Sequence, residues 1–260
     1  MKTKYLVSLC VLATLASPSY AAILAADDAS HVTYDDGIQN TDNGGFGFQP
    51  WILGASQGGG HFVGTSGNNG GGTTSPNIDT AGRSWGSWAL LSHVSTLQRD
   101  FDFDPALAYK TSMMLDNGWI TAGSIAGRVE LTNEDSVGLI FRGGQTNYEF
   151  LSIENGVHNY FDSGIGFTDT GMAFSVTKLS DGVFQLDTTR LSDSASASHV
   201  VTTDSFANMA QIVLANISAG PGSTNDAFIN SVQVESVPEP ATMVLMTAGL
   251  GALAARRRKK

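Results

Sequence analysis

Apolar and polar residues alternate along most of the middle of the chain, which is the pattern of β-strands with one buried face. No stretch between residues 22 and 237 keeps the period of an α-helix. Residues 97–103 are the clearest strand, with Leu97, Arg99, Phe101 and Phe103 on one face and Asp100, Asp102 and Asp104 on the other. The pattern predicts strands over residues 51–53, 61–63, 84–91, 97–103, 138–141, 147–153, 157–161, 172–179, 183–187, 211–217 and 228–234.

Two short turns join pairs of these strands into hairpins. Asn155-Gly156 separates residues 147–153 from 157–161, and Asp181-Gly182 separates residues 172–179 from 183–187. Both dipeptides suit tight turns that need a positive φ. Strands and hairpins together predict an all-β fold, an antiparallel β-sandwich of the jelly-roll type running from about Ile23 to Val234.

Residues 41–75 are rich in glycine, including the runs 58–60 and 70–72. We expect long loops here, interrupted by the two short strands at 51–53 and 61–63. A phosphate-binding loop is excluded because no lysine or fingerprint spacing follows in a strand-loop-helix context.

The N-terminus has the three parts of a secretory signal peptide, predicted to span residues 1–21. Lys2 and Lys4 precede an apolar run that is too short to cross a bilayer, and small residues lead up to Ala21. We expect signal peptidase to cut between Ala21 and Ala22; the less favoured alternative is a retained anchor helix. The only cysteine, Cys10, would leave with the signal, so the predicted domain of residues 22–237 contains no disulfide.

Composition changes abruptly after Val237. Residues 238–240 read Pro-Glu-Pro and are followed by the uncharged apolar segment 241–255. As a helix this segment would be about 22 Å long, short of a bilayer core of about 30 Å. The five cations Arg256, Arg257, Arg258, Lys259 and Lys260 favour a C-terminus left in the cytoplasm. A short apolar membrane helix at 241–255 accounts for these cations better than a helix packed on the domain.

The order of Pro-Glu-Pro, apolar helix and basic cluster resembles the PEP-CTERM sorting signal of Gram-negative bacteria. The resemblance covers residues 238–260 and implies that Pro238, Glu239 and Pro240 are recognised by an exosortase. It also implies an inner-membrane intermediate, removal of the tail, and transfer to the cell surface or to an extracellular matrix rich in polysaccharide.

The predicted domain is similar, more diffusely, to concanavalin-A-like or LamG-like ectodomains. The residues behind this resemblance are 79–86, the Asp-rich strand with Phe101 and Phe103, the strand 138–141, and the strand 228–234 that leads into the sorting signal.

Residues 22–237 hold seven basic and 23 acidic residues, a net charge of about −16. Such a surface cannot neutralise phosphates, so nucleic acid is excluded as a partner. The same charge is ordinary for a soluble extracellular protein.

Candidate chemistry is sparse. A glycoside hydrolase needs two neighbouring carboxylates; Glu130, Glu134 and Asp135 come nearest, but their turn-like context predicts a solvated loop. The alternating Asp100, Asp102 and Asp104 suggest calcium ligands, although an acidic solvent face is favoured because calcium needs about six to eight oxygens. The histidines have no metal-ligand spacing and are expected to be surface or strand residues: His31, His61, His93, His158 and His199.

We therefore assign no catalytic residue, metal or cofactor. The favoured function is a non-catalytic exported surface or matrix protein that holds polysaccharide through exposed Trp and Tyr and polar loops. The alternative is an extracellular glycan hydrolase with an unrecognised site.

Overall fold

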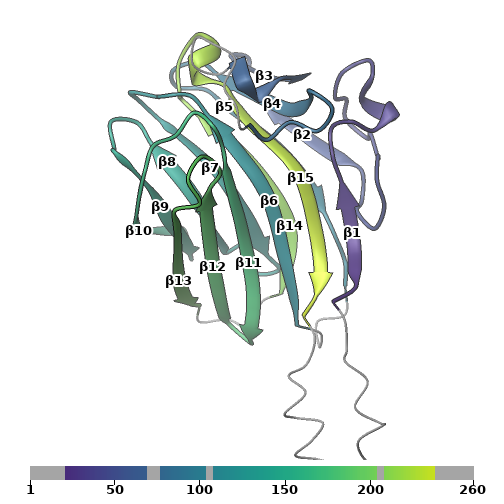
Figure 1. The fold of residues 1–260 in the computed structure, drawn as a ribbon, viewed down its shortest axis with the longest axis vertical. Coiled ribbons are helices and arrows are strands. Elements are labelled where there is room, and N and C mark those ends of the chain that lie inside the picture. The colour runs from purple at the N-terminus through teal and green to yellow at the C-terminus, as the bar shows by residue number, and fades with distance from the viewer. Residues whose placement is uncertain (1–20, 69–76, 104–107, 204–207, 238–260) are drawn as a thin grey trace, which may run out of the picture.

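The computed structural model describes residues 21–68, 77–103, 108–203 and 208–237. Two antiparallel β-sheets pack face to face (Figure 1). Sheet A has the order β13-β12-β11-β6-β15-β4-β3, with β1 also paired to β15, and sheet B has the order β10-β9-β8-β7-β14-β5-β2. The predicted all-β fold of two antiparallel sheets is thus confirmed.

The strands are β1 (Ile23–Asp27), β2 (Trp51–Ala55), β3 (Gly59–Gly64), β4 (Ser84–Ala89), β5 (Val94–Asp100), β6 (Tyr109–Asn117), β7 (Ser124–Leu131), β8 (Ser136–Arg142), β9 (Asn147–Glu154), β10 (Val157–Gly166), β11 (Met172–Ser180), β12 (Val183–Arg190), β13 (Ser196–Thr202), β14 (Met209–Ile217) and β15 (Ala227–Ser236).

Helical structure in the described residues is limited to the 3-10 turns η1 (Val32–Tyr34), η2 (Ser66–Asn68) and η3 (Ser223–Asn225). Among these residues no helix has the length and apolar character that crossing a membrane would require. The predicted signal peptide and the predicted apolar helix at 241–255 lie outside the described residues.

The core lies between the inner faces of the two sheets, where alternate residues of each strand point. In β5, Leu97 and Arg99 are fully buried, and Phe101 just beyond the strand is nearly so, as the alternation predicted. The strand itself ends at Asp100, three residues earlier than predicted. Trp51, Trp85 and Tyr34 join this core through edge-on ring contacts.

Both predicted hairpins are present. Asn155 and Gly156 have φ values of 51° and 77° and connect β9 to β10, with Glu154 paired to Val157. Gly182, at φ 68°, turns β11 into β12. Each predicted strand has a counterpart, whereas β1, β6, β7 and β13 were not predicted.

The glycine-rich region before β2 is a loop that packs directly on β1. Ala26 and Phe46 exchange backbone hydrogen bonds of 3.0 Å. A Cβ on Gly45 would lie 2.1 Å from the carbonyl oxygen of Ala26, and one on Gly47 would lie 2.2 Å from that of Leu24. These glycines are therefore required by the close approach of two backbones, beyond their positive φ values.

A buried ionic network joins the N-terminal segment to sheet B. The guanidinium of Arg99 has no exposed surface and donates to Asp27 Oδ2 at 2.5 Å. It also donates to the backbone carbonyls of Gln49 at 2.6 Å and Gly44 at 2.9 Å, and to Asn43 Oδ1 at 2.6 Å. Because isolated charges are costly to bury, this set of partners is what allows Arg99 to occupy a core position.

Tyr34 completes the network from the other side of Asp27. Its hydroxyl donates to Asp27 Oδ2 at 2.5 Å and accepts from Trp51 Nε1 at 3.0 Å. Burial, reinforced by the hydrogen bond to Asp27, raises the pKa of Tyr34 to about 12. The phenol therefore stays protonated and keeps donating at every physiological pH.

Asp226 directly follows η3, and its buried carboxyl should make the folding stability of the domain depend on pH. Burial raises the pKa of its carboxyl from the ordinary 3.8 to about 7. An acid whose pKa is raised by folding favours the folded state only while it is protonated, so stability falls as pH rises from about 4 to about 7. Asp226→Asn should therefore be more stable than wild type above pH 7, by on the order of 2 kcal/mol after allowance for its partial exposure, and nearly equal at pH 4.

Urea unfolding of residues 22–237, which contain every described strand, would measure this at both pH values. Asp102→Asn removes an exposed aspartate and serves as the control. Equal pH profiles for wild type and Asp226→Asn would contradict the prediction.

Candidate functional site

The beginning of β1 and the end of β15 lie together at one end of the sandwich (Figure 1). Ile23 pairs with Glu235, and the Ala22 N–H donates to Ser236 Oγ at 2.9 Å while the Ser236 N–H donates to the Ala22 carbonyl at 2.9 Å. Val237 donates to the carbonyl of Ala108 at 2.8 Å. The predicted cleavage site between Ala21 and Ala22 therefore lies beside the point where the C-terminal tail leaves the domain.

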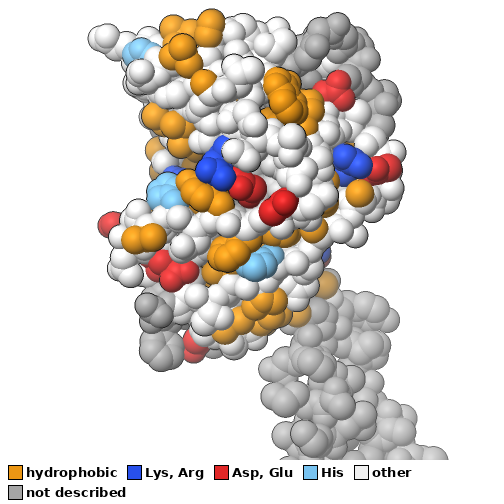
Figure 2. Space-filling view, turned by 90° about the vertical axis from the view of Figure 1, so that its left-hand side faces the viewer, with side chains coloured by type: hydrophobic (Ala, Val, Ile, Leu, Met, Phe, Trp, Pro, Cys, Tyr) orange, Lys and Arg blue, Asp and Glu red, His pale blue; other side chains and the backbone are white. Residues whose placement is uncertain are grey.

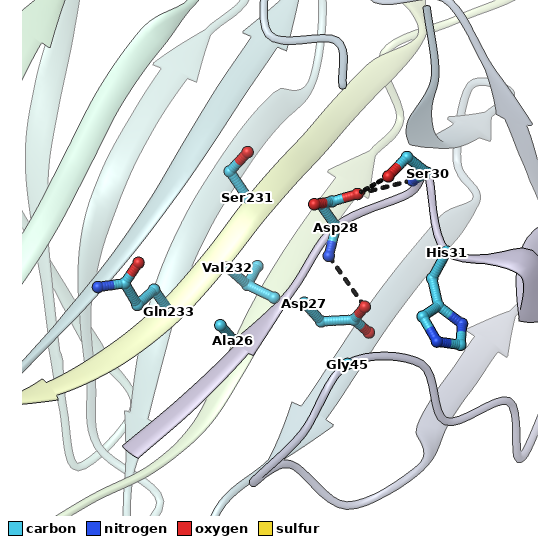
Figure 3. A pocket seen from close by; sticks show the side chains of 9 residues that line it. All are labelled: Ala26, Asp27, Asp28, Ser30, His31, Gly45, Ser231, Val232 and Gln233. Atoms are coloured by element: carbon cyan, nitrogen blue, oxygen red, sulfur yellow. Dashed lines mark hydrogen bonds between the residues drawn. The ribbon is translucent and has the colours of Figure 1, made fainter. Parts of the chain in front are cut away.

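A hollow of about 330 Å³ opens where β1 and β15 meet on the outer face of sheet A (Figure 3). Gln233 and Ser231 line it from β15, and Asp28, Ser30 and His31 line it from the segment after β1. Asp28 Oδ1 accepts hydrogen bonds from the Ser30 N–H at 2.8 Å and the Ser30 hydroxyl at 2.5 Å. These bonds fix the Asp28 carboxylate at the rim.

The floor of this hollow is held by the buried network described above. Asp27 lines the hollow, and the backbone N–H of the next residue, Asp28, donates to Asp27 Oδ1 at 2.9 Å (Figure 3). Burial raises the pKa of Asp27, and the hydrogen bonds from Tyr34 and Arg99 only partly oppose this effect. Asp27 is thus fixed in place as a structural group, already engaged by Tyr34 and Arg99.

A second hollow of about 310 Å³ continues across the same face over β6, β11 and β12. The two hollows meet at Ser231, which lines both. We call the combined feature the sheet A groove. Its second half is lined by Lys110, Ser112, Met113, Met114, Ala173, Phe174, Ser175, Asp187, Thr189 and Ser231.

A β-bulge in β15 lies at the centre of the sheet A groove. The register between β15 and β6 shifts between Asn230 and Gln233, and Ser231 has φ 50°. The buried Asn230 side chain accepts from the Ala29 N–H at 3.0 Å and donates to the carbonyls of Ile78 and Arg83 at 2.8 and 2.9 Å. These contacts hold the bulge and the neighbouring loops in one arrangement.

A third hollow, of about 660 Å³, lies where β5 and β7 end and β14 begins. Asp100, Asp102 and Glu130 line it together with Phe101 and Phe103. Asp100 and Glu130 both pair with Gln211, from opposite sides of β14. Strand spacing places their Cα atoms about 9.6 Å apart.

The predicted solvated loop at Glu130, Glu134 and Asp135 is wrong for two of the three residues. Glu130 lies in β7 and is ion-paired with Arg128 at 2.7 Å. Asp135 is buried, and its carboxylate accepts from the Asn155 N–H at 2.9 Å, which ties this turn to the β9–β10 hairpin. Only Glu134 is exposed in a turn, at φ 70°.

The calcium arrangement suggested for Asp100, Asp102 and Asp104 stays a prediction. β5 ends at Asp100, Asp102 follows the strand and lines the same hollow, and Asp104 lies outside the described residues. Gln211 Nε2 donates to Asp100 Oδ1. In the described part of the chain no three His, Cys, Asp or Glu side chains group as metal ligands.

The histidines are surface or strand residues, as predicted. His31 precedes η1 and accepts from the Thr33 N–H, and His61 lies in β3, where burial lowers its pKa. His93 contacts Ser56, and His158 contacts Tyr160 on the exposed strand β10. His199 stacks against Phe150 and Phe161.

In the described part of the chain, the exposed Trp and Tyr side chains do not line any of the three hollows. They are Trp88, Trp119 and Tyr160, with exposed fractions of 37%, 45% and 38%. Tyr160 lies on the exposed strand β10. Figure 2 shows apolar side chains and histidines scattered over one flank of the molecule. The sheet A groove, which sequence patterns did not indicate, is lined by Ser, Thr, Gln, Asp and Lys together with apolar Met, Phe, Ala and Val residues.

Residues 236–259 match the protein-family model described as the PEP-CTERM protein-sorting motif. The chain carries a PEP-CTERM sorting motif. The motif implies an exported protein that an exosortase processes and that is sorted to the surface of a Gram-negative cell.

The sorting motif begins within the folded domain, because its first residue, Ser236, is the last residue of β15. Pro238, Glu239 and Pro240 fall inside the match, as do Arg256, Arg257, Arg258 and Lys259. All of these, with Lys260, lie outside the described residues. No curated protein sequence matches the chain.

Among solved structures, the chain is similar to the binding domain of botulinum neurotoxin serotype D, at 10% identity and a TM-score of 0.43, over 81% of this chain and 50% of that one. It is similar to domain 4 of AbnA, a GH43 extracellular arabinanase from Geobacillus stearothermophilus, at 12% identity and a TM-score of 0.45, over 87% and 98%. Arcelin-5, a lectin-like defense protein from Phaseolus vulgaris, matches at 10% identity and a TM-score of 0.40, over 73% and 93%. The chain spans about half the length of the neurotoxin binding domain.

Proposed function

We propose that this is a non-catalytic protein that an exosortase delivers to the cell surface or extracellular matrix of a Gram-negative bacterium, where its β-sandwich associates with polysaccharide. Signal peptidase removes residues 1–21. The domain then remains attached to the inner membrane through the tail until Pro238, Glu239 and Pro240 are recognised and the tail is removed.

The observation that carries this proposal is the sorting motif that directly continues β15. β1 and β15 pair at the same end of the sandwich, so both predicted processing sites lie at one end of the domain. The domain would therefore be attached to the membrane at this end, and the outer faces of both sheets would be accessible to extracellular ligands.

The outer face of sheet A supports association with polysaccharide. Hydroxyl, amide and carboxylate side chains, interspersed with apolar residues, line two adjoining hollows there. Sugars present many hydroxyl groups, and binding sites recognise such ligands through a few well-placed hydrogen-bonding groups. The exposed Trp and Tyr side chains lie elsewhere, so the expected aromatic recognition is replaced in this proposal by hydrogen bonding.

A glycan hydrolase is the second candidate, and the third hollow is the observation that favours it. Asp100 and Glu130 flank Gln211 at a Cα spacing close to the carboxyl separation of about 6.5–9.5 Å in inverting glycosidases. A general acid, however, must be free to reach the substrate. The Glu130 carboxylate is already engaged by Arg128, whose Nη2 lies 2.7 Å from Glu130 Oε1, and this contact favours the non-catalytic function.

One assay separates the two candidates. The domain of residues 22–237 is incubated with a panel of polysaccharides, and both binding and the release of reducing ends are measured. We expect binding without release of reducing ends. Release that is abolished in Glu130→Gln, with Glu134→Gln as the exposed control, would show that the protein is a hydrolase.

A further inference from the structure

We propose that the sheet A groove is the binding site for a polysaccharide chain without acidic substituents, and that chains with free amino groups bind it most tightly. This inference rests on the proposed association with polysaccharide. It adds the location of the site and the chemical class of the ligand.

The sheet A groove has the extent that an elongated polymer requires. Its two hollows have volumes of about 330 and 310 Å³ and meet at Ser231. Its lining comes from β12, β11, β6, β15 and β1 in turn, which are neighbours in sheet A. At an inter-strand spacing of about 4.8 Å, these five strands span roughly 19 Å, so a chain lying in the groove would run across the strands.

Two acidic groups of the groove, Asp28 and Asp187, are held by hydrogen bonds before any ligand arrives. Ser112, Ser175 and Gln233 project from paired strands of the sheet. Asp187 accepts from Gln185 Nε2 at 3.0 Å and from the Ser198 hydroxyl at 2.6 Å. Side chains held in this way lose little conformational entropy when they bind sugar hydroxyls.

The bulge at Ser231 lies where the two hollows meet. A serine at φ 50° is strained, and the strain lies in a strand that pairs with neighbours on both sides. Bulges redirect side chains, and backbone strain gathers at ligand sites. Here the bulge places Ser231 at the junction of the two hollows, where it contacts both halves of a bound chain.

Charge determines the class of polysaccharide. Lys110 is the only lysine or arginine lining the groove, and its Nζ lies 3.4 Å from a carboxylate oxygen of Glu235. Asp28 and Asp187 therefore give the groove a net negative charge. The domain as a whole has a net charge of about −16. One Asp28 oxygen is engaged by Ser30 and the other is turned toward β15 (Figure 3). Uronate, sulfate or phosphate groups would be repelled here, whereas protonated amino groups would be attracted.

The test compares residues 22–237 with variants on three soluble polymers: a partly deacetylated amino-sugar polymer, a neutral glucan and a uronic acid polymer. Gln233→Arg fills the groove and adds a positive charge. Gln98→Arg is the matched control, because Gln98 lies in β5 of the opposite sheet and faces none of the groove. Ser231→Gly removes the junction hydroxyl and keeps the positive φ without strain.

We expect the amino-sugar polymer to bind more tightly than the glucan, and the uronic acid polymer not to bind. Gln233→Arg should weaken binding by about tenfold, Ser231→Gly by a smaller factor, and Gln98→Arg should leave it unchanged. Asp28→Asn combined with Asp187→Asn should remove the preference for the amino-sugar polymer and its salt dependence.

Preference for the uronic acid polymer, or binding that Gln233→Arg and Ser231→Gly leave intact, would overturn the groove assignment while the polysaccharide function stands. Failure of the wild-type domain to bind any of a wider polysaccharide panel would overturn both. Unchanged melting temperatures of the variants establish that a loss of binding is local.

Discussion

Replacing Arg99 by leucine is expected to destabilise the domain by about 3–5 kcal/mol, because the substitution leaves the Asp27 carboxylate buried without its cation. It also removes donors to the carbonyls of Gln49 and Gly44, which hold the glycine-rich loop against β5. The loss should be smaller at pH 4 than at pH 8. Burial already raises the pKa of Asp27, and without Arg99 the carboxyl can escape the cost of a buried charge by binding a proton.

Urea unfolding of residues 22–237 measures this loss, and the double variant Asp27→Leu with Arg99→Leu is the control. Removing both charges eliminates the unpaired carboxylate, so the double variant should recover part of the stability lost in Arg99→Leu. A single variant that unfolds at the same urea concentration as wild type would show that the network contributes nothing to the fold.

Deleting residues 238–260 is expected to convert a surface-attached protein into a soluble secreted domain. All described strands and their contacts lie before residue 238, so the sandwich keeps its core and its β1–β15 pairing. What is lost is the apolar segment 241–255 and the basic cluster, which are suited to hold the chain at a membrane after signal cleavage.

A finer change separates sorting from simple anchoring. Replacing Pro238, Glu239 and Pro240 by alanine keeps the apolar segment and the five cations but removes the recognition motif. An unprocessed form should then accumulate in the inner membrane. Substituting Glu235, which lies before the motif, by alanine is the control and should leave processing unchanged.

The alternation of apolar and polar residues predicted most of the sandwich because strand faces are set by the local sequence. It missed β13, where Ser196, Ser198 and Val200 are exposed on an edge strand and no clear apolar face exists. It also missed β6, whose end at Asp116 and Asn117 is buried through tertiary contacts and so breaks the alternation. β1 follows the predicted signal peptide directly, and its small residues carry little periodic signal.

Of the buried ion pair, the sequence indicated only Arg99. Arg99 was placed on an apolar strand face, which is itself a sign of a buried partner, but Asp27 is 72 residues away along the chain. The sheet A groove could not be predicted for the same reason. Its side chains come from segments far apart in the sequence, including five strands of which two were not predicted. The sorting motif, in contrast, is a contiguous stretch that can be read without knowing the fold.

Determining both ends of the protein recovered from the cell surface tests the central claim most directly. Mass spectrometry of terminal peptides from the fractionated wild-type and triple-alanine proteins would suffice. The account predicts a surface form that begins at Ala22 and lacks Arg256–Lys260, and a triple-alanine form that stays in the inner membrane and still ends at Lys260. A wild-type surface protein that retains Lys260, or a triple-alanine variant processed and attached like wild type, would contradict it.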